Sequence, residues 1–460
     1  MASISNMFWL SKGEISPLEV KKAKKALTVY PRSSPLDVVP PEKIEQFQET
    51  ATHLGVPFAY AELAFPKVVV TDDTSYGNLF VPKRLPDPLH PKAPPNQKVF
   101  FDDLYEAVSN FWSVLAVAPT GSGKTVAILN TIGRLQVTAL VVVPSTVLAD
   151  QWKEEAVRHL GLLSSEVGLL QGSNNQWVGK KVVIAVIHNL FLKEWPEEFK
   201  TYFGLVAWDE CHKLGARVFS TTMFMFYSRY KVAVTATPDR KDGCDVIYKN
   251  YFGSPLAVAK SKALSCDCYA IEFPHIGKKH FWISKCKSDA KPLQWLSKLP
   301  VRNLLIIKLA CYLYDSGYSV VILSRFIEHV ELIIDGLISS GVPKEEVGQF
   351  TRSTSSGKKH GKGYLDKVKN EANIIVGTYT MIKEGVDIPR LDAGIEALPI
   401  ADGVQAIGRI RRPFPNKKRP KWFSIVDKNV AIFEAYSKAR FRGFEAANVT
   451  LKQLDWRSIQ

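Results

Sequence analysis

Cysteine is scarce in this 460-residue sequence, and long hydrophobic runs are missing from it. Six cysteines are too few for the disulfide framework of a secreted scaffold, and they favour a reducing compartment. No apolar run approaches the roughly 20 residues that a membrane-spanning helix needs. The first ten residues have no basic segment followed by an apolar stretch, so we expect neither a secretory signal nor a membrane partner.

The charge is strongly one-sided. Lysine and arginine number 60 against 45 aspartates and glutamates, which gives a net charge of +15. Residues 351–442 carry +10 of this excess. A basic surface attracts polyanions, of which nucleic acid is the commonest. The same excess of basic residues could serve solubility alone, so the net charge by itself identifies no function.

The length predicts more than one domain, because hydrophobic cores usually stop growing near about 250–300 residues. Six prolines in residues 82–96 indicate a linker, since proline lacks a backbone donor and restricts the residue before it. We therefore expect a small α/β unit over residues 1–90, with a helix after Ser16 and a strand over 65–71.

Beyond residue 110, short apolar runs alternate with segments of helical periodicity, a pattern typical of a parallel sheet covered on both faces. The alternation stops near residue 240 and resumes after 300, which predicts two α/β domains in tandem, over 91–258 and 259–460. We expect strands at 114–117, 139–143, 182–187, 205–208, 232–235, 320–323, 373–376 and 422–426, and helices at 126–135, 148–160, 304–314, 327–338 and 430–442.

A glycine-rich turn lies between the first of these strands and its helix. Ala118-Pro119-Thr120-Gly121-Ser122-Gly123-Lys124-Thr125 has the form of a phosphate-binding loop, although alanine stands where the general pattern begins with glycine. Its backbone N–H groups would surround phosphate oxygens. Lys124 would reach the β- and γ-phosphates, and the Thr125 hydroxyl would bind Mg²⁺.

Two adjacent carboxylates end another predicted strand. Asp209-Glu210-Cys211-His212 follows the apolar residues 205–208. One carboxylate can hold the shell of a magnesium ion while the next polarises an attacking water. Such a pair is weak evidence alone, but the phosphate-binding loop upstream and the strand–helix alternation between them predict the two halves of an ATP-hydrolysing site.

With these motifs in place, the sequence resembles the superfamily 2 helicases and translocases over about residues 97–442, and Asp209 to His212 resemble the DEAH form. The resemblance implies two tandem RecA-like parallel-sheet domains preceded by the small α/β domain. Other segments follow in the family's order: Pro144-Ser145-Thr146 with Asp150-Gln151-Trp152, Thr235-Ala236-Thr237-Pro238, Thr378 with Glu384-Gly385-Val386-Asp387-Ile388-Pro389, and Gln405-Ala406-Ile407-Gly408-Arg409-Ile410-Arg411-Arg412.

The resemblance assigns roles to these residues. Arg409 and Arg412, but not Arg411, would offset charge on the transferred phosphate from the second domain, and Gln405 would contact the γ-phosphate or the water. His212, Thr235 and Thr237 would couple the ATP site to nucleic acid. The remaining implied contacts are Ser145, Thr146 and Thr378 with nucleic acid, and Gly385 and Asp387 with the nucleotide, beside Thr120, Gly121, Ser122 and Gly123.

Two positions depart from the family or match it weakly. Gln97 lies 27 residues before Lys124 and would recognise adenine, yet a solvated linker glutamine fits the proline-rich surroundings nearly as well. Val186 stands where members commonly carry a threonine that contacts nucleic acid. We expect a buried valine there; the phosphate contact is then either lost or supplied by His188 or Asn189.

The motif variants favour DNA over RNA. Asp-Glu-Cys-His, Thr-Ala-Thr and Gln405 resemble DNA-repair and recombination helicases, including phage enzymes and the XPB and RecG groups. Basic runs at residues 21–25, 358–362 and 417–421 suit contact with phosphates. Each run is as consistent with a solvated face, and Lys358, Lys359 and Lys362 in the Gly/Ser-rich segment are the contacts we favour, since loops reach a groove without disturbing a core.

The sequence therefore predicts an ATP- and Mg²⁺-dependent DNA helicase that remodels forked or branched DNA in recombination, repair or replication, acting as a monomer on its track. We expect it in the cytoplasm or nucleoid, or in the host cytoplasm if it is a phage protein. A duplex translocase, a non-translocating nucleic-acid-sensing ATP switch and an RNA helicase stay open as alternatives. We expect Cys266, Cys268 and Cys286 to be ordinary cysteines and not zinc ligands, because the Cys-x-Cys spacing is tight and no second pair follows it.

Overall fold

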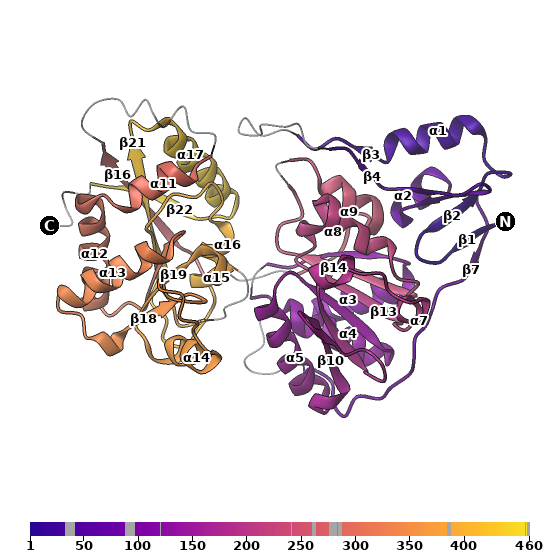
Figure 1. The fold of residues 1–460 in the computed structure, drawn as a ribbon, viewed down its shortest axis with the longest axis horizontal. Helices are drawn as coiled ribbons and strands as arrows, with labels where there is room; N and C mark the ends of the chain where they lie inside the picture. The colour runs from indigo at the N-terminus through magenta and orange to yellow at the C-terminus, as the bar shows by residue number, and fades with distance from the viewer. Residues whose placement is uncertain are drawn as a thin grey trace. The chain divides into compact units, whose positions relative to one another are not determined.

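The computed structural model describes residues 1–32, 42–87, 97–119, 121–240, 242–259, 264–275, 283, 288–383, 388–455 and 457. The chain divides into two compact units, Met1–Ser261 and Lys262–Gln460, drawn in indigo to magenta and in orange to yellow in Figure 1. The boundaries proposed at residues 90 and 258 stay predictions. Among the described helices, none has both the length and the apolarity needed to cross a bilayer.

An eight-stranded sheet forms the centre of the first unit, in the order β11-β10-β12-β9-β13-β14-β8-β15. All paired neighbours are parallel except β10 and β11. The strands are β8 (Val114–Val117), β9 (Ala139–Val143), β10 (Val167–Gln171), β11 (Asn174–Asn175), β12 (Val182–Val186), β13 (Leu205–Asp209), β14 (Tyr230–Thr235) and β15 (Pro255–Val258).

Both faces of this sheet are buried, which explains why its strands are continuous apolar runs. Successive residues of β9 alternate between two cores: Ala139, Val141 and Val143 belong to one, and Leu140 and Val142 to the other. The first core packs under α3 (Gln97–Asn110), α4 (Lys124–Leu135) and α5 (Thr146–Leu160); the second contains residues of α6 (Ile187–Phe191), α7 (Glu197–Thr201) and α9 (Asp245–Phe252), with Phe219 of α8 (Arg217–Ser220) packed against it.

The N-terminal residues form their own five-stranded sheet but share the second core with the large sheet. Its order is β5-β6-β2-β1-β7. Tyr251 of α9 donates its hydroxyl to the Asn6 carbonyl at 3.0 Å, and its ring meets Phe58 edge-on. The elements are β1 (Ala2–Ile4), β2 (Phe8–Ser11), α1 (Pro17–Ala26), β3 (Thr28–Val29), β4 (Ile44–Glu45), β5 (Gln48–Glu49), β6 (His53–Val56), α2 (Phe58–Ala64) and β7 (Val70–Asp72).

The second unit repeats the architecture with a fully parallel seven-stranded sheet, ordered β18-β19-β17-β20-β21-β16-β22. Its elements are β16 (Asp267–Pro274), α11 (Ala290–Ser297), α12 (Pro300–Asp315), β17 (Val320–Ser324), α13 (Ile327–Ser339), β18 (Val347–Phe350), α14 (Lys362–Glu371), β19 (Ile374–Thr378), α15 (Tyr379–Lys383), β20 (Ala393–Glu396), α16 (Val404–Ile410), β21 (Lys421–Lys428), α17 (Ala431–Ala446) and β22 (Thr450–Leu454).

The predicted fold class is confirmed, and the predicted strands and helices after residue 110 exist within a few residues of their expected bounds. The predicted N-terminal helix also exists: Ser16 caps α1 and exchanges bonds with Glu19. The strand expected over 65–71 is wrong at its start, since Phe65 is the C-cap of α2 and β7 begins only at Val70. Several short strands, including β10, β15 and β18, have no counterpart in the prediction.

Candidate functional site

Three neighbouring strands of the first unit end beside one another and bring the predicted nucleotide motifs together. In the order β13-β14-β8, Asp209 ends β13, Thr235 ends β14, and Ala118 follows β8. The Ala118 N–H donates to the Thr235 carbonyl at 2.9 Å. Because the strands are parallel, their carboxyl ends meet at one sheet edge, which is where open α/β sheets bind ligands.

The glycine-rich turn has the backbone that a phosphate cradle requires. Gly121 and Gly123 have φ angles of 85° and 88°, in the left-handed region that residues with a Cβ avoid. Ser122 closes the turn, because its N–H and hydroxyl both bond the Pro119 carbonyl, at 3.1 and 2.7 Å. Lys124 and Thr125 then begin α4. Thr120 lies outside the described residues.

Lys124 meets the paired carboxylates directly. Its Nζ lies 2.9 Å from Oε1 of Glu210, and the two side chains are only 11% and 22% exposed. Glu210 has a φ of 51°, so the chain turns sharply there as it leaves β13. Two motifs that are 86 residues apart in the chain thus converge on one point of the sheet edge.

Asp209 is buried, with a relative exposure of 9%, and both of its carboxylate oxygens are used. Oδ2 accepts the indole N–H of Trp152 at 3.0 Å, and Oδ1 accepts the backbone N–H of Glu210 at 2.9 Å. Burial raises the pKa of Asp209, and the Lys124 cation opposes that rise. The carboxylate is therefore held in one orientation in a site that favours a nearby positive charge.

His212, Thr235 and Thr237 form a connected group behind Glu210. His212 Nδ1 lies 3.4 Å from Glu210 Oε2 and 3.1 Å from the Thr235 hydroxyl. That hydroxyl accepts the Thr237 N–H at 3.1 Å. Burial lowers the pKa of His212, against the opposing effect of Glu210. Thr235 thus links the other two residues assigned to coupling, and His212 contacts the predicted catalytic carboxylate.

Gln97 lies against the phosphate-binding loop. It begins α3 and is buried, with 6% exposure. A Cβ built on Gly123 would lie 2.0 Å from the Gln97 amide nitrogen, so the side chain covers this glycine closely. This position is unlike that of a solvated linker residue, and its role toward adenine stays a prediction.

The residues expected to contact nucleic acid in the first unit follow β9 and β12. Ser145 is buried and caps α5 by accepting the Leu148 N–H, while Thr146 is exposed at the start of the helix. Val186 is buried at 5% exposure, as predicted, and His188 beyond it is exposed. Asn189 donates instead to the Gly172 carbonyl at 3.0 Å.

In the second unit the predicted finger residues lie on and just after α16. Gln405, Arg409 and Arg412 are half-buried. Arg411 differs, since it is 9% exposed and its guanidinium donates to the carbonyls of Leu264 and Ala447 at 2.9 and 2.7 Å. Arg411 therefore stabilises the fold, in keeping with its exclusion from the finger role.

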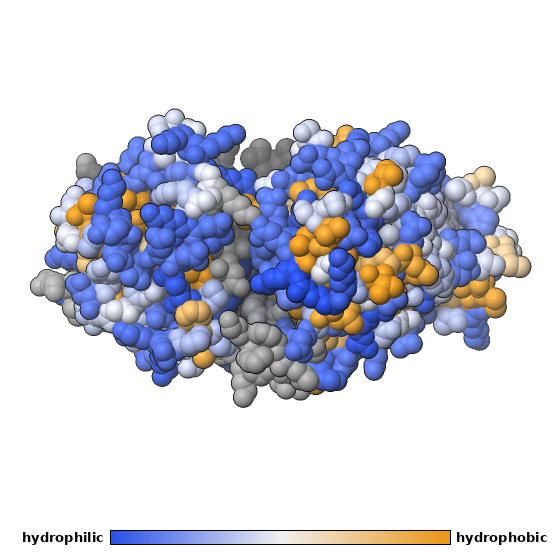
Figure 2. All heavy atoms as spheres, turned by 90° about the horizontal axis from the view of Figure 1, so that it is seen from below, coloured by the Kyte–Doolittle hydropathy of each residue, from blue (hydrophilic) through white to orange (hydrophobic). Residues whose placement is uncertain are grey.

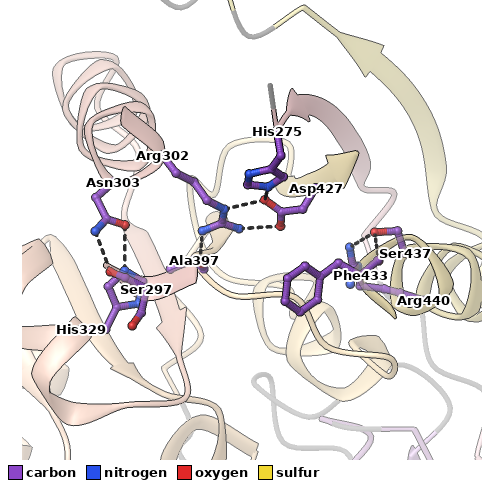
Figure 3. Close-up of polar contacts among 10 residues, drawn as sticks. All are labelled: His275, Ser297, Arg302, Asn303, His329, Ala397, Asp427, Phe433, Ser437 and Arg440. Atoms are coloured by element: carbon purple, nitrogen blue, oxygen red, sulfur yellow. Dashed lines mark hydrogen bonds and ion pairs between the residues drawn. The ribbon is translucent and has the colours of Figure 1, made fainter. Parts of the chain in front are cut away.

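Buried charged side chains fix the segment that leads from β20 into α16, and Figure 3 shows the contacts of Arg302 with Asp427 and Ala397. Arg302 is fully buried, pairs with Asp427 at 2.8 Å and donates to the Ala397 carbonyl. Arg440 pairs with Glu396 at 2.8 Å and donates to the Ile400 carbonyl. No short sequence pattern predicts this role of Arg302, because nothing local to a sequence reveals a bond to a carbonyl 95 residues away.

His275 and Tyr379 extend this network. His275 Nε2 lies 3.0 Å from Asp427 Oδ1, and the Tyr379 hydroxyl donates to the Leu398 carbonyl at 2.7 Å. Thr378, the predicted contact at the end of β19, directly precedes Tyr379. Gly385 and Asp387 lie outside the described residues.

The basic Gly/Ser-rich segment, which we expected to be a loop, forms a short hairpin. Ser353 pairs with Lys359, and Ser355 bonds Glu331 of α13 through its N–H and hydroxyl. Lys358 and Lys359 are exposed on this hairpin. Lys362 begins α14, and its side chain is outside the description.

The surface seen in Figure 2 is mostly hydrophilic, with hydrophobic atoms in scattered groups among the hydrophilic ones. Among the residues that the structure describes, no group of three or more His, Cys, Asp or Glu is arranged to hold a metal ion. Cys266 and Cys268 are buried, which raises the pKa of each thiol. Cys286 is outside the described part of the chain.

Comparison with known proteins finds similar sequences among helicases and a match to one family model. Residues 91–240 match the family model described as type III restriction enzyme, res subunit. The chain is 24% identical to a putative ATP-dependent RNA helicase of Acanthamoeba polyphaga mimivirus, over 96% of this chain and 85% of that protein. It is 26% identical to the DNA 3'-5' translocase XPB2 of Sulfurisphaera tokodaii, over 71% of this chain and 80% of that one.

Solved structures agree on the fold. The structure of Mss116p bound to ssRNA and AMP-PNP aligns with a TM-score of 0.56 at 16% identity. The alignment covers 79% of this chain and 75% of Mss116p. Dbp5 of S. cerevisiae bound to RNA and ADP BeF3 gives a TM-score of 0.53 at 16% identity, over 80% of this chain and 91% of that one. At these identities the likeness shows the RecA-like fold alone.

Proposed function

We propose that this chain, an ATP-hydrolysing helicase of superfamily 2, uses DNA as its track and remodels forked or branched duplexes as a monomer. The observation that carries the ATP-hydrolysing part of this proposal is the convergence of Lys124 and Glu210 at 2.9 Å. It joins a phosphate-binding loop to paired carboxylates at the carboxyl ends of parallel strands, which is the arrangement that phosphoryl transfer needs.

Within this proposal each residue at the sheet edge has one task. The N–H groups of the turn from Gly121 to Gly123 and the Lys124 ammonium bind the phosphates. The Glu210 carboxylate orients the attacking water and accepts its proton. Because Lys124 neutralises Glu210 in this arrangement, a phosphate that draws Lys124 away frees the carboxylate for that water.

The donors fit Mg²⁺. The Thr125 hydroxyl and the Asp209 carboxylate are the oxygen donors that this hard cation prefers, and it commonly takes only one or two protein ligands beside phosphates and water. A buried carboxylate whose pKa is raised by burial is also stabilised by an added cation. Bound Mg²⁺ would offset the charge on the phosphate oxygens.

We assign Arg409 and Arg412 of the second unit to the charge that builds up on the transferred phosphate. Their place beside α16, after a segment fixed by Arg302 and Arg440, supports this role, since a donor acts best when its position is preorganised. Arg411 is committed to Leu264 and Ala447. Gln405 would contact the γ-phosphate or the water.

DNA is favoured over RNA by the motif variants and by the relatives named as XPB translocase and helicase. An RNA helicase is the second candidate, because the mimivirus relative, which aligns with 96% of this chain, is named as one. The part of the proposal that names forked or branched DNA as the substrate, and repair or recombination as the process, rests on the sequence motifs. These motifs resemble those of DNA-repair and recombination helicases.

The proposal is tested by strand displacement on a forked duplex with ATP and Mg²⁺. Release of the labelled strand that requires ATP is the expected result. Displacement of a third strand from a triplex without separation of the duplex would support the translocase instead. ATP turnover on DNA with neither form of displacement would support the non-translocating switch.

Removing two positive charges from the hairpin should weaken nucleic-acid binding. The double variant Lys358→Ala/Lys359→Ala should bind DNA more weakly and with a log–log salt slope shallower by about 1 to 2, because each phosphate contact releases about one counterion. Basal ATP hydrolysis should not change. Binding is measured by fluorescence anisotropy across a salt series.

The matched control is Lys291→Ala/Lys298→Ala, which removes the same charge from exposed positions at α11 of the same unit. It should leave the slope unchanged. Equal losses in the two double variants would mean that only net charge matters, and an unchanged affinity in the hairpin variant would make the hairpin a spacer.

A further inference from the structure

Trp152 links α5, the helix that begins at the predicted nucleic-acid contact Thr146, to Asp209 of the predicted ATP site. It belongs to α5 and is 1% exposed, packed in the core of the first unit. Its single donor, the indole N–H, is directed at Asp209 Oδ2 at 3.0 Å. Trp152 follows the predicted nucleic-acid contacts Ser145 and Thr146 in the sequence, but its ring is too deeply buried to touch nucleic acid.

The bond has a specific consequence for Asp209. The other carboxylate oxygen is held by the Glu210 N–H at 2.9 Å, which belongs to the adjacent residue and moves with it. The Trp152 indole is therefore the contact that ties the Asp209 carboxylate to a different element. Without it, the hydrogen bond that stays on the carboxylate is the one from the adjacent Glu210 N–H.

The first turn of α5 reaches the protein surface at Thr146. Ser145 caps the helix, and Thr146 is exposed at its first turn. Trp152 is six positions after Thr146, about 9 Å along the helix axis. A displacement of the helix end at Thr146 is thus transmitted to the indole, because one regular helical segment carries both residues.

We propose that Trp152 is a positioning residue that couples nucleic-acid contact at the start of α5 to the orientation of the Asp209 carboxylate. The inference rests on the proposed function, since it takes Thr146 as a nucleic-acid contact and Asp209 as the holder of Mg²⁺. The coupling acts through the indole N–H, and the packing of the ring against the core is a separate contribution to stability.

The test compares two variants that each lose one buried indole donor. Trp152→Phe removes the bond to Asp209. The control Trp195→Phe removes a bond of 2.9 Å to the Leu190 carbonyl from a ring that is 5% exposed in the same unit. Thermal unfolding should show similar losses of stability, so any further difference reports on the ATP site.

Two readouts separate positioning from stability. The first is the ratio of nucleotide affinity with Mg²⁺ to that with EDTA, measured with a fluorescent ATP analogue. The second is the factor by which DNA stimulates ATP turnover. In Trp152→Phe both ratios should fall by about tenfold, the usual effect of removing a residue that orients a metal ligand; in Trp195→Phe neither should change.

Thr146→Ala, an exposed and fold-neutral change, supplies a second route. It should lower the DNA stimulation, and combined with Trp152→Phe it should cause little further loss, because two residues on one path are not additive. Full additivity, or wild-type ratios in Trp152→Phe, would overturn the coupling. If the wild-type protein itself shows no stimulation by any nucleic acid, the proposed function fails and not this bond.

Discussion

Lys124→Ala should hydrolyse ATP at least about a hundredfold more slowly than the wild-type chain, the typical cost of losing one donor to developing charge. The ammonium lies at the start of α4 and 2.9 Å from Glu210, so its loss removes the cation that both the phosphates and the paired carboxylate use. Steady-state phosphate release in the presence of DNA measures the effect.

The loss should be chemical and not structural. Lys98→Ala is the matched control, since Lys98 forms an exposed ion pair with Asp102 at 2.6 Å in the neighbouring helix α3 and such pairs contribute little. Both variants should keep the wild-type thermal unfolding midpoint within a few degrees and bind DNA. ATP turnover by Lys124→Ala near the wild-type rate would contradict the assignment of residues 118–125 as a phosphate-binding loop.

Arg412→Ala should lower the maximal rate of ATP hydrolysis about a thousandfold while ATP affinity changes only a few-fold. An arginine finger acts on charge that appears in the transition state, and its removal costs about 10³ to 10⁵ in rate. The separation of rate from affinity is measured by comparing kcat with the binding of a fluorescent ATP analogue.

Two other arginines of the second unit calibrate this result. Arg442 is exposed on α17, and Arg442→Ala should leave the rate unchanged. Arg411→Ala should instead destabilise the second unit, because its guanidinium satisfies the Leu264 and Ala447 carbonyls. A loss of affinity without a loss of rate in Arg412→Ala would argue against the finger role.

Much of the fold follows from sequence pattern. β9 and β12 were predictable because strands buried on both faces read as unbroken apolar runs. Residues 68–69 show where this fails: two valines suggested a strand, yet Val69 is 82% exposed, since β propensity is overridden when no neighbour pairs with the chain. The hairpin at 353–359 was unpredictable for a related reason, as its order comes from Glu331 on another helix.

The site was predictable to the extent that its chemistry is local. The phosphate-binding loop and Asp209-Glu210 are contiguous motifs, and parallel-sheet topology implies that they meet. The contacts that hold them are not local. Gln97 covers Gly123, Trp152 reaches Asp209, and Arg302 bonds Ala397, and each pairing depends on packing that no short pattern records.

The central claim is that this chain couples ATP hydrolysis to DNA. The most direct test is steady-state ATP turnover without nucleic acid and then with single-stranded DNA, plain duplex, a fork, a four-way junction and RNA. We predict the strongest stimulation by the fork or junction. Stimulation by RNA alone, or by no nucleic acid at all, would contradict the account.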